Sequence, residues 1–159
     1  GAGELGYTRV PDWTSPIPGA SDALERLCSG WAIERRIQEA LLEPDAPLAR
    51  LSKGKPQNRT CAMLAEAMRQ GDPYACAEIE RIAHALGLAI ANVITLAHPE
   101  RVAVGGGVSL MGETLFEPLR RAVHEYVFKP YRSHYVIVPS ELGEQAVPVG
   151  AILLAQESV

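Results

Sequence analysis

Residues Arg101–Ser109 read Arg-Val-Ala-Val-Gly-Gly-Gly-Val-Ser. This stretch is the strongest indication of the fold, because it joins a short β-type run to three consecutive glycines. Helical patterns precede and follow it. Val102 and Val104 predict a buried strand, and Gly105–Gly107 allow the backbone to turn sharply and to approach a ligand without interference from a Cβ atom. Ligands in open α/β sheets bind outside the carboxyl ends of the strands. The stretch therefore predicts a strand-to-helix turn that is a candidate nucleotide site.

The three glycines alone leave two interpretations open. They do not complete the motif Gly-x-Gly-x-x-Gly, because Leu110 stands where the last glycine should be, and no Lys-Ser/Thr pair follows as in a P-loop. One interpretation is a nucleotide-binding turn, and the other is a tight connection from strand to helix with no ligand. The sequence around the turn has to decide between them.

The longest helical pattern lies directly before this stretch. Asp72-Pro73 is a strong helix start, with a capping carboxylate followed by proline in the first helical position. The helix is predicted to run to about Ala97 and to end before Pro99. Its apolar residues recur at spacings of three and four: Ile79, Ile82, Ala83, Leu86, Ile90, Val93, Ile94 and Ala97. We interpret it as the core helix of the domain.

After the glycine turn, the pattern continues as helix, strand and helix. A helix is predicted over Glu113–Phe128, interrupted or kinked near Pro118, and a β-branched strand over His134–Val138. Residues 101–138 thus form strand–helix–strand, which within one sheet implies a right-handed parallel crossover. The apolar stretch Ala146–Gln156 predicts a last helix that packs against the sheet.

The N-terminal half is predicted to be mostly helical. A short strand is expected over Leu5–Val10, followed by a proline-rich loop over Pro11–Gly19. A single helix is expected over Asp22–Leu42. Its buried stripe comprises Leu24, Leu27, Cys28, Ile33, Ile37 and Leu41. Residues 43–59 are polar and are interpreted as an exposed connector, and a short helix over 60–69 follows them.

Composition and charge fit an ordinary globular domain. Of the 159 residues 47% are hydrophobic, and the net charge of −4 argues against non-specific binding to nucleic acid or to an anionic membrane. No apolar run reaches transmembrane length and no signal peptide opens the chain, so we expect a cytoplasmic protein without a membrane partner. Cys28, Cys61 and Cys76 lack a close C-x-x-C pairing and predict reduced, mostly buried thiols.

Two features predict that the chain is a piece of a longer protein. It begins without an initiating Met. Two or three strands also make a poor sheet for three long apolar helices, so further strands are expected before residue 1.

Several segments, in consistent order along the whole chain, resemble the ROK family of bacterial sugar kinases and related repressors. The opening Gly3-Glu4-Leu5-Gly6-Tyr7 is similar to that family's Gly-Glu-x-Gly-His segment. Ala23-Leu24-Glu25, followed by Cys28-Ser29-Gly30, is similar to its Cys-x-Glu and Ser-Gly segment. The other similar segments are Gly71-Asp72-Pro73 with the long helix, Asn92 with His98-Pro99-Glu100, Val104–Ser109, and Gly143–Ala146 with Val149-Gly150-Ala151.

The resemblance implies that residues 1–159 form the C-terminal lobe of the actin-like ATPase fold, also called ribonuclease H-like. This is an α/β lobe, rich in helix, with a small, partly parallel sheet. In such kinases two lobes close over a sugar and ATP. A carboxylate of the N-terminal lobe deprotonates the sugar hydroxyl that attacks the γ-phosphate, and Mg²⁺ neutralises charge. The implied function is that of an ATP-dependent kinase for glucose or a related hexose, with its catalytic carboxylate outside this chain, so that the chain alone is expected to be inactive.

The same resemblance assigns the ligand-binding residues. The implied sugar-binding residues are Glu4, Tyr7 and Glu25, and the implied nucleotide-binding residues are Gly105, Gly106 and Gly107. A carboxylate accepts hydrogen bonds from two sugar hydroxyls well. The residue types alone also allow an interpretation without a ligand. In that interpretation Glu4 is an exposed turn residue, and Glu25 is an ordinary carboxylate in the first turn of a helix.

The chain departs from the family at its structural zinc. Many members hold this ion with one His and three Cys. The corresponding places here hold Tyr7, Pro16, Pro18 and Ala23. We therefore expect no structural zinc and no other metal site in the chain. The family's histidine also touches the sugar, so the presence of Tyr7 predicts that substrate choice differs from glucose or is lost.

Two other functions would use the same lobe. One is the effector-sensing domain of a ROK repressor, in which sugar binding modulates a separate helix-turn-helix, and only this alternative implies binding to nucleic acid. The other is a degenerate relative without catalysis. The resemblance also implies a homodimer formed through this lobe.

Overall fold

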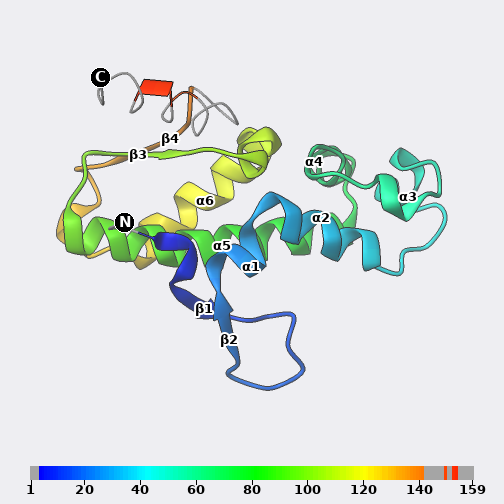
Figure 1. Cartoon of the computed structure of the whole chain (residues 1–159), viewed down its shortest axis with the longest axis horizontal. Coiled ribbons are helices and arrows are strands. Elements are labelled where there is room, and N and C mark those ends of the chain that lie inside the picture. Colours follow the sequence, from blue (N-terminus) through cyan, green and yellow to red (C-terminus); the bar gives the residue numbers. More distant parts are fainter. Residues whose placement is uncertain (1–3, 142–148, 150–151, 154–159) are drawn as a thin grey trace.

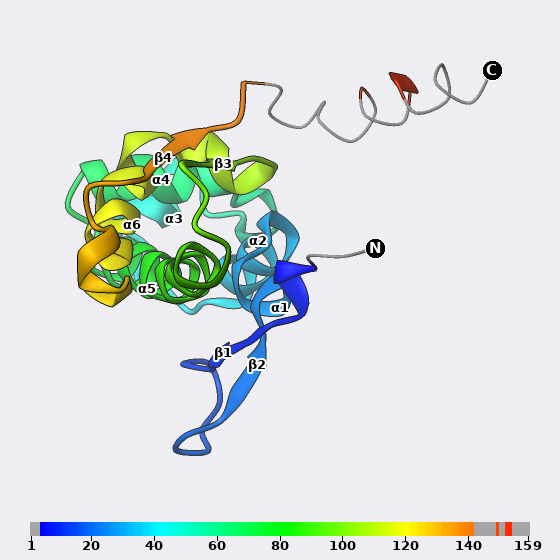
Figure 2. The same ribbon diagram turned by 90° about the vertical axis from the view of Figure 1, so that its left-hand side faces the viewer.

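Helices form most of the computed structural model, which describes residues 4–141, 149 and 152–153 (Figures 1 and 2). Among these residues, two small two-stranded sheets accompany the helices. In chain order, with η for a 3₁₀ helix, the elements are η1 (Leu5–Tyr7), β1 (Arg9–Pro11), β2 (Ser21–Ala23), α1 (Leu24–Cys28), α2 (Gly30–Glu39), α3 (Pro47–Leu51), η2 (Pro56–Asn58), α4 (Cys61–Arg69), α5 (Pro73–Ala97), β3 (Arg101–Val104), η3 (Gly107–Met111), α6 (Glu113–Tyr126), η4 (Lys129–Tyr131) and β4 (Val136–Pro139). The last predicted helix, Ala146–Gln156, lies largely outside the described residues.

Helix α5 is the longest of these elements, and α1, α4, α6 and β1 contact it (Figure 1). Asp72 caps its start, where one carboxylate oxygen accepts hydrogen bonds from the backbone N–H groups of Tyr74 and Ala75. His98, in the left-handed conformation, ends the helix after Ala97. Both predicted ends are confirmed, because each depends on chemistry that is local in the sequence.

The apolar character of α5 belongs to the core. By length and composition this helix is sufficient to cross a membrane, so the expectation that no apolar run reaches that length was wrong. Half of its most apolar window is buried inside the protein, and α5 contacts α1, α4 and α6. A helix that buries residues on several faces is typical of the centre of a packed domain.

Gly87 lets α5 and α6 approach each other closely in this core. A Cβ atom at Gly87 would lie 2.6 Å from the Cβ atom of Ala122 and 3.2 Å from the backbone nitrogen of Val123. Real Cβ atoms do not come so close, so α6 would have to move to accept any side chain here.

Gly87→Ala is therefore expected to lower the free energy of unfolding by about 1–2 kcal/mol, although alanine is the better helix former. Alanine contributes up to about 1 kcal/mol of helix propensity, but overpacking typically costs about 1–3 kcal/mol. Ala122→Gly restores the space, so the double variant should be more stable than the two single changes predict by addition. Urea unfolding of all four proteins measures this coupling, and strictly additive effects would contradict the close contact.

Strands β3 and β4 pair in parallel, with Arg101 opposite Val136, and helix α6 connects them. The predicted strand–helix–strand unit is thus confirmed. Val102 and Val104 are only half-buried, contrary to the prediction, because β3 is an edge strand of a sheet that has two strands among the described residues. Helix α6 runs through Pro118 without the expected interruption, since the proline removes only one backbone hydrogen bond and is itself buried.

The predicted single helix over Asp22–Leu42 is wrong. Residues Ser21–Ala23 form β2, and two helices, α1 and α2, follow and meet at Ser29. The Ser29 backbone is extended and its hydroxyl accepts a hydrogen bond from the N–H of Ala32, so a new helix starts there. The second helix ends early, and Leu41, expected in the core, is 99% exposed.

Strands β1 and β2 form an antiparallel hairpin that projects from the helices (Figure 2). Of the strand expected over Leu5–Val10 only the end is present, because Leu5–Tyr7 form a 3₁₀ turn. The backbone N–H of Leu24 donates to the carbonyl of Thr8 over 2.9 Å, which ties the hairpin to the start of α1. Residues 12–20 form the loop of the hairpin, as the prolines predict.

Residues 43–59 are not simply an exposed connector, which corrects the prediction. Helix α3 lies within them and buries Leu48. Arg59 is 3% exposed, and its guanidinium donates to the carbonyls of Ile37 and Ala40, which lie at the end of α2. A positive charge at a helix C-terminus is favourable. Residues 43–59 therefore pack onto the core, although their polar composition predicts an exposed connector.

Candidate functional site

The glycine turn lies at the carboxyl end of β3, as predicted. Gly106 has a φ of 74°, in the left-handed region that favours glycine, and a Cβ atom there would meet no atom within 4 Å. The Ser109 hydroxyl donates to the Gly106 carbonyl over 2.7 Å and fixes the turn. The backbone of Gly105–Gly107 is consequently held in an open place where a ligand can reach it.

The start of α2 closes one side of this turn. A Cβ atom at Gly30 would lie 3.4 Å from the Cα atom of Gly107, so the start of α2 and the glycine turn are in van der Waals contact. Beside this contact is a cavity of about 570 Å³. Its lining residues are Gly30, Trp31, Glu34, Thr60, Cys61, Ala62, Gly107 and Leu110. A cavity of this size is in the range of small-molecule sites.

An aromatic ring stands at the edge of this cavity. Trp31 is 55% exposed, and the guanidinium of Arg35 lies 5.4 Å from the centre of its ring. Leu110, also exposed, lines the same cavity. A flat ring and an apolar side chain beside free backbone groups can hold a planar base by stacking and by hydrogen bonding.

The inner wall of the cavity is polar and well held. The N–H of Cys61 donates to the Glu34 carboxylate over 3.1 Å, and its thiol lies 3.7 Å from the carbonyl of Gly30. Thr60 caps α4 by accepting a hydrogen bond from the N–H of Met63. Burial raises the pKa of the Cys61 thiol to about 12, so the sulfur stays protonated at neutral pH. The pKa of Cys28 is raised to about 12 for the same reason.

The residues assigned to the sugar lie near the start of α1, whereas the cavity beside Gly107 lies beyond its end. Glu25 is half-buried in the first turn of α1. A Cβ atom at Gly6 would lie 3.3 Å from the Glu25 Cβ atom and 3.5 Å from its carboxylate, so η1 rests directly on this side chain. Glu4 begins η1 and is exposed, and Tyr7 ends it with 69% of its surface exposed.

Both carboxylates are available to a ligand. Neither the Glu4 nor the Glu25 side chain forms a hydrogen bond or ion pair with another described residue. The same holds for the hydroxyl of Tyr7. A carboxylate that accepts no hydrogen bond from the protein keeps its full capacity for sugar hydroxyls.

Helix α1 connects the two groups of residues. Glu25 lies in its first turn, and Gly30 follows its end after Ser29. Figures 1 and 2 place η1, α1 and the start of α2 on one side of α5. The structure thus brings together the two segments that the sequence assigned to different ligands, on opposite ends of one short helix.

Sequence reasoning missed most of the cavity wall. Trp31 directly follows the Ser-Gly segment that carried the resemblance, so its position in the sequence was the one sign that it could belong to the site. Leu110 was considered only because it breaks a glycine motif. Cys61 and Thr60 lie far away in the sequence, and only the packing of α4 against η3 and α2 brings them here.

The residues at the family's zinc positions do not fit a zinc ion. Pro16, Pro18 and Ala23 offer no side-chain donor, and they lie in the β1–β2 hairpin with Tyr7 just before it. Over residues 4–141 and the other described positions, no group of three His, Cys, Asp or Glu residues is arranged to hold a metal. The hairpin is instead held by its own contacts, including the hydrogen bond of Thr14 N–H to the Asp12 carboxylate over 2.8 Å.

Comparison with known proteins gives consistent results. The sequence is 34% identical over 157 residues to the glucokinase of Thermotoga maritima, a match that covers 98% of this chain and 50% of that enzyme. It is 25% identical over 158 residues to the transcriptional regulator NagC of Escherichia coli, covering 99% of this chain and 37% of the regulator. The chain thus spans about half the length, or less, of these curated relatives.

Solved structures give the same answer for the fold. A ROK family glucokinase from Streptomyces griseus, in complex with glucose and AMPPNP, superposes with a TM-score of 0.78 at 32% sequence identity. The match covers 98% of this chain and 52% of that one. These neighbours confirm the expected actin-like ATPase lobe. The ROK family sequence model matches residues 1–158, and the chain therefore belongs to the ROK family.

Proposed function

We propose that this chain is the sugar- and nucleotide-binding lobe of an ATP-dependent hexose kinase. The observation that carries the proposal is the contact of Gly107 with Gly30, beside helix α1, which has Glu25 in its first turn. Because Glu25 lies in the first turn of α1 and Gly30 follows the end of that helix, this contact supports a sugar at Glu25 and a nucleotide at the glycine turn of the same lobe. Similarity to proteins named glucokinase, one of them bound to glucose and AMPPNP, supports the same assignment.

Each residue then has a distinct role in binding. Glu4 and Glu25 accept hydrogen bonds from sugar hydroxyls, and Tyr7 offers a hydroxyl at the place where the family has histidine. The backbone of Gly105–Gly107 contacts the nucleotide, and Trp31 stacks on the base. The catalytic carboxylate belongs to the other lobe, and ATP is used with Mg²⁺, which neutralises phosphate charge.

A panel of hexoses and N-acetylhexosamines, assayed with ATP and Mg²⁺ on the full-length protein, tests this proposal. Formation of a sugar phosphate and ADP with at least one of these sugars is the expected result. Tight sugar binding without any product would favour a sensor, and the similarity to NagC gives that second candidate its support. Only in that case do we expect binding to nucleic acid.

Trp31 provides a direct test of the nucleotide site. Titration with AMPPNP is expected to quench its fluorescence, because a stacked base changes the environment of the indole. Trp31→Ala should weaken AMPPNP binding about fivefold or more, since stacking on an aromatic ring contributes about 1–3 kcal/mol, and leave glucose affinity unchanged. Trp13→Phe, which alters the other tryptophan of the chain, is the matched control. Equal AMPPNP affinity in all three proteins would place the base elsewhere.

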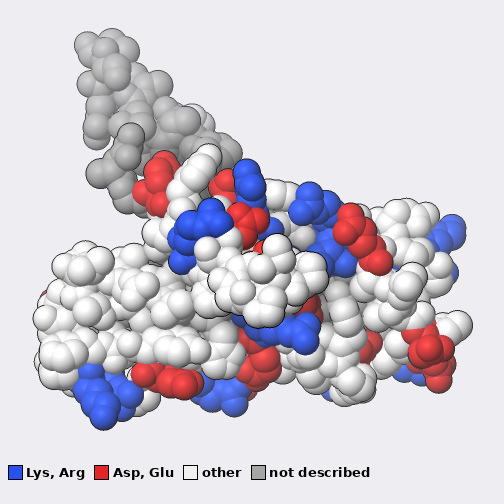
Figure 3. Space-filling model, turned by 90° about the horizontal axis from the view of Figure 1, so that it is seen from below, with Lys and Arg blue, Asp and Glu red and all other residues white. Residues whose placement is uncertain are grey.

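We further propose that the protein acts in the cytoplasm as a homodimer formed through this lobe. Exposed apolar side chains such as Leu96 at the end of α5 and Phe128 after α6 give it surface for such an interface, and Figure 3 shows a wide uncharged area on one face of the lobe. Sedimentation of the full-length protein should show a dimer at micromolar concentration, and a monomer at high concentration would contradict the proposal.

A further inference from the structure

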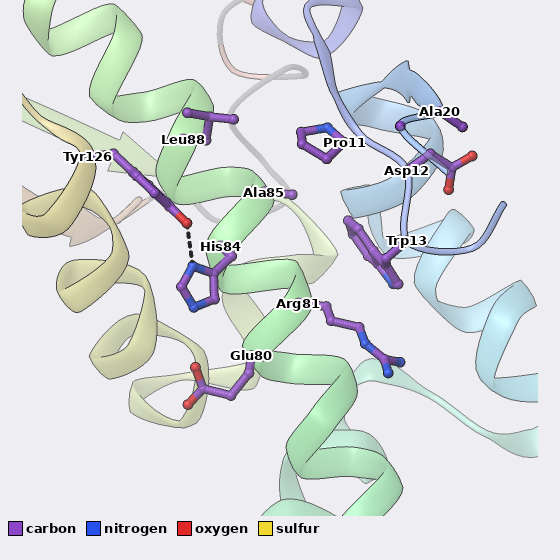
Figure 4. Close-up of a pocket in the computed structure, with 11 residues that line it drawn as sticks. Pro11, Asp12, Trp13, Ala20, Glu80, Arg81, His84, Ala85, Leu88 and Tyr126 are labelled. Atoms are coloured by element: carbon purple, nitrogen blue, oxygen red, sulfur yellow. Dashed lines mark hydrogen bonds between the residues drawn. The ribbon is translucent and has the colours of Figure 1, made fainter. Parts of the chain in front are cut away.

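A second cavity, of about 450 Å³, lies between the loop of the β1–β2 hairpin and helix α5 (Figure 4). None of the residues that line it lines the cavity beside Gly107. Its surface is formed mainly by apolar and aromatic side chains, with a few charged groups among them. This is the composition of small-molecule sites, which typically measure about 300–1,000 Å³.

One wall of this second cavity is a tryptophan held in a fixed orientation. The guanidinium of Arg36 lies over the ring of Trp13, 5.4 Å from its centre, and does not itself line the cavity. Arg36 is anchored by a 2.5 Å hydrogen bond from its Nε to the carboxylate of Glu78, which is 2% exposed. The indole nitrogen of Trp13 is buried and has no hydrogen-bond partner among the described residues.

The facing wall comes from α5 and the end of α6. Figure 4 shows Ala85 and Leu88 opposite the hairpin, with His84 and Tyr126 beside them. His84 Nδ1 and the Tyr126 hydroxyl lie 2.8 Å apart, and their rings meet edge to face. Trp13 thus faces the apolar residues Ala85 and Leu88 of α5, and the His84–Tyr126 pair lies at the edge of the cavity on the α6 side of that helix. Such a slot fits a flat aromatic molecule better than a flexible or strongly hydrated one.

The charged groups at the edge indicate the polar part of the occupant. The Glu80 carboxylate is already bound to Arg121 over 2.7 Å, and that of Asp12 accepts hydrogen bonds from Thr14. Arg81 is less engaged, because the carboxylate of Glu78 is 3.8 Å away from it, and half of its side chain is exposed. Figure 4 shows the Arg81 side chain extending from α5 toward Trp13. An arginine in this position can pair with one anionic group on the ligand.

We propose that this cavity is a binding site for a planar aromatic molecule that carries one anionic group. Its ring system lies between Trp13 and the apolar face of α5 at Ala85 and Leu88, and its anionic group pairs with Arg81. The site is separate from that of the sugar and the nucleotide, and it does not depend on the function proposed above.

Binding of 8-anilinonaphthalene-1-sulfonate, a flat aromatic sulfonate, to the folded full-length protein tests this site. The dye is expected to bind with enhanced fluorescence and to stay bound when AMPPNP is added at saturation. Leu88→Glu should lower the affinity for the dye at least tenfold. Leu96→Glu, on the same helix and at a position that is 87% exposed, should leave this affinity unchanged. Arg81→Gln, on the surface, should weaken it about threefold or more without affecting the fold.

Three results would overturn the proposal. They are the absence of dye binding to the unaltered protein, equal affinity of the Leu88→Glu and Leu96→Glu variants, and displacement of the dye by AMPPNP. Unchanged affinity in Arg81→Gln would refute the anionic part of the assignment. Circular dichroism and the melting temperature of each variant distinguish loss of the site from loss of the fold.

Discussion

Asp72→Ala is expected to lower the free energy of unfolding by about 2–5 kcal/mol, the largest effect on stability that we predict. Its carboxylate caps α5 through the N–H groups of Tyr74 and Ala75, and loss of such a cap costs about 0.5–2 kcal/mol. The second carboxylate oxygen accepts a 3.0 Å hydrogen bond from the N–H of Leu48. Asp72 is 1% exposed, so that donor would be left buried and unpaired, at a further cost of about 1–3 kcal/mol.

Urea unfolding, with fluorescence and circular dichroism as probes, measures this change. Asp45→Ala is the control, because Asp45 is exposed in a turn and its replacement should alter stability by less than about 0.5 kcal/mol. Asp72→Asn keeps one acceptor for the cap but offers an NH₂ group to Leu48, so its stability should lie between that of Asp72→Ala and that of the unaltered protein. A loss of less than 1 kcal/mol in Asp72→Ala would contradict a joint role in capping α5 and docking α3.

Asp72 also illustrates which features the sequence can predict. The start of α5 was predicted because a cap and a proline act on their nearest neighbours. The hydrogen bond to Leu48 was not, since it joins residues that are 24 positions apart. Without that bond in view, the polar composition of residues 43–59 indicated an exposed connector. Local chemistry therefore gave the ends of helices, and long-range contacts decided how segments dock.

The break at Ser29 has a similar cause. Leu27, Cys28, Ile33 and Ile37 are all buried, as a single amphipathic helix would require, so hydrophobic spacing gives no sign of an interruption. What distinguishes the region is the extended backbone of Ser29, whose hydroxyl caps α2, and the approach of Gly107 to Gly30 at the start of that helix. Only the folded chain shows this contact.

The candidate site divides in the same way. The resemblance to a known family identified Glu4, Glu25 and the glycine turn as site residues, because each lies in a short segment whose neighbouring residues also match that family. Trp31 and Leu110 directly follow two of these segments, but the resemblance assigns neither of them to a ligand. They enter the candidate site only through the cavity that three distant elements enclose.

Glu25→Ala is expected to lower kcat/KM for the sugar of the full-length enzyme about 100-fold or more, the largest effect on activity that we predict. A hydrogen bond to a charged group contributes about 1.5–3 kcal/mol, and a carboxylate can accept from two hydroxyls. Glu25→Gln keeps one acceptor and should lose about tenfold. Both variants should keep their affinity for AMPPNP, because Glu25 does not line the cavity beside Gly107, where we propose that the nucleotide binds.

Stability separates this effect from a structural one. The Glu25 carboxylate has no hydrogen-bond partner or ion-pair partner among the described residues, so its removal should cost only the favourable interaction with the N-terminus of α1, about 0.3–1 kcal/mol. Glu39→Gln, at the exposed end of α2, is the matched control and should leave kcat/KM unchanged. Steady-state kinetics with the preferred sugar of the panel gives the comparison. If Glu25→Ala retains kcat/KM within threefold of the unaltered enzyme, this carboxylate does not bind the sugar, and the hydroxyls must be held by Glu4 or by the other lobe.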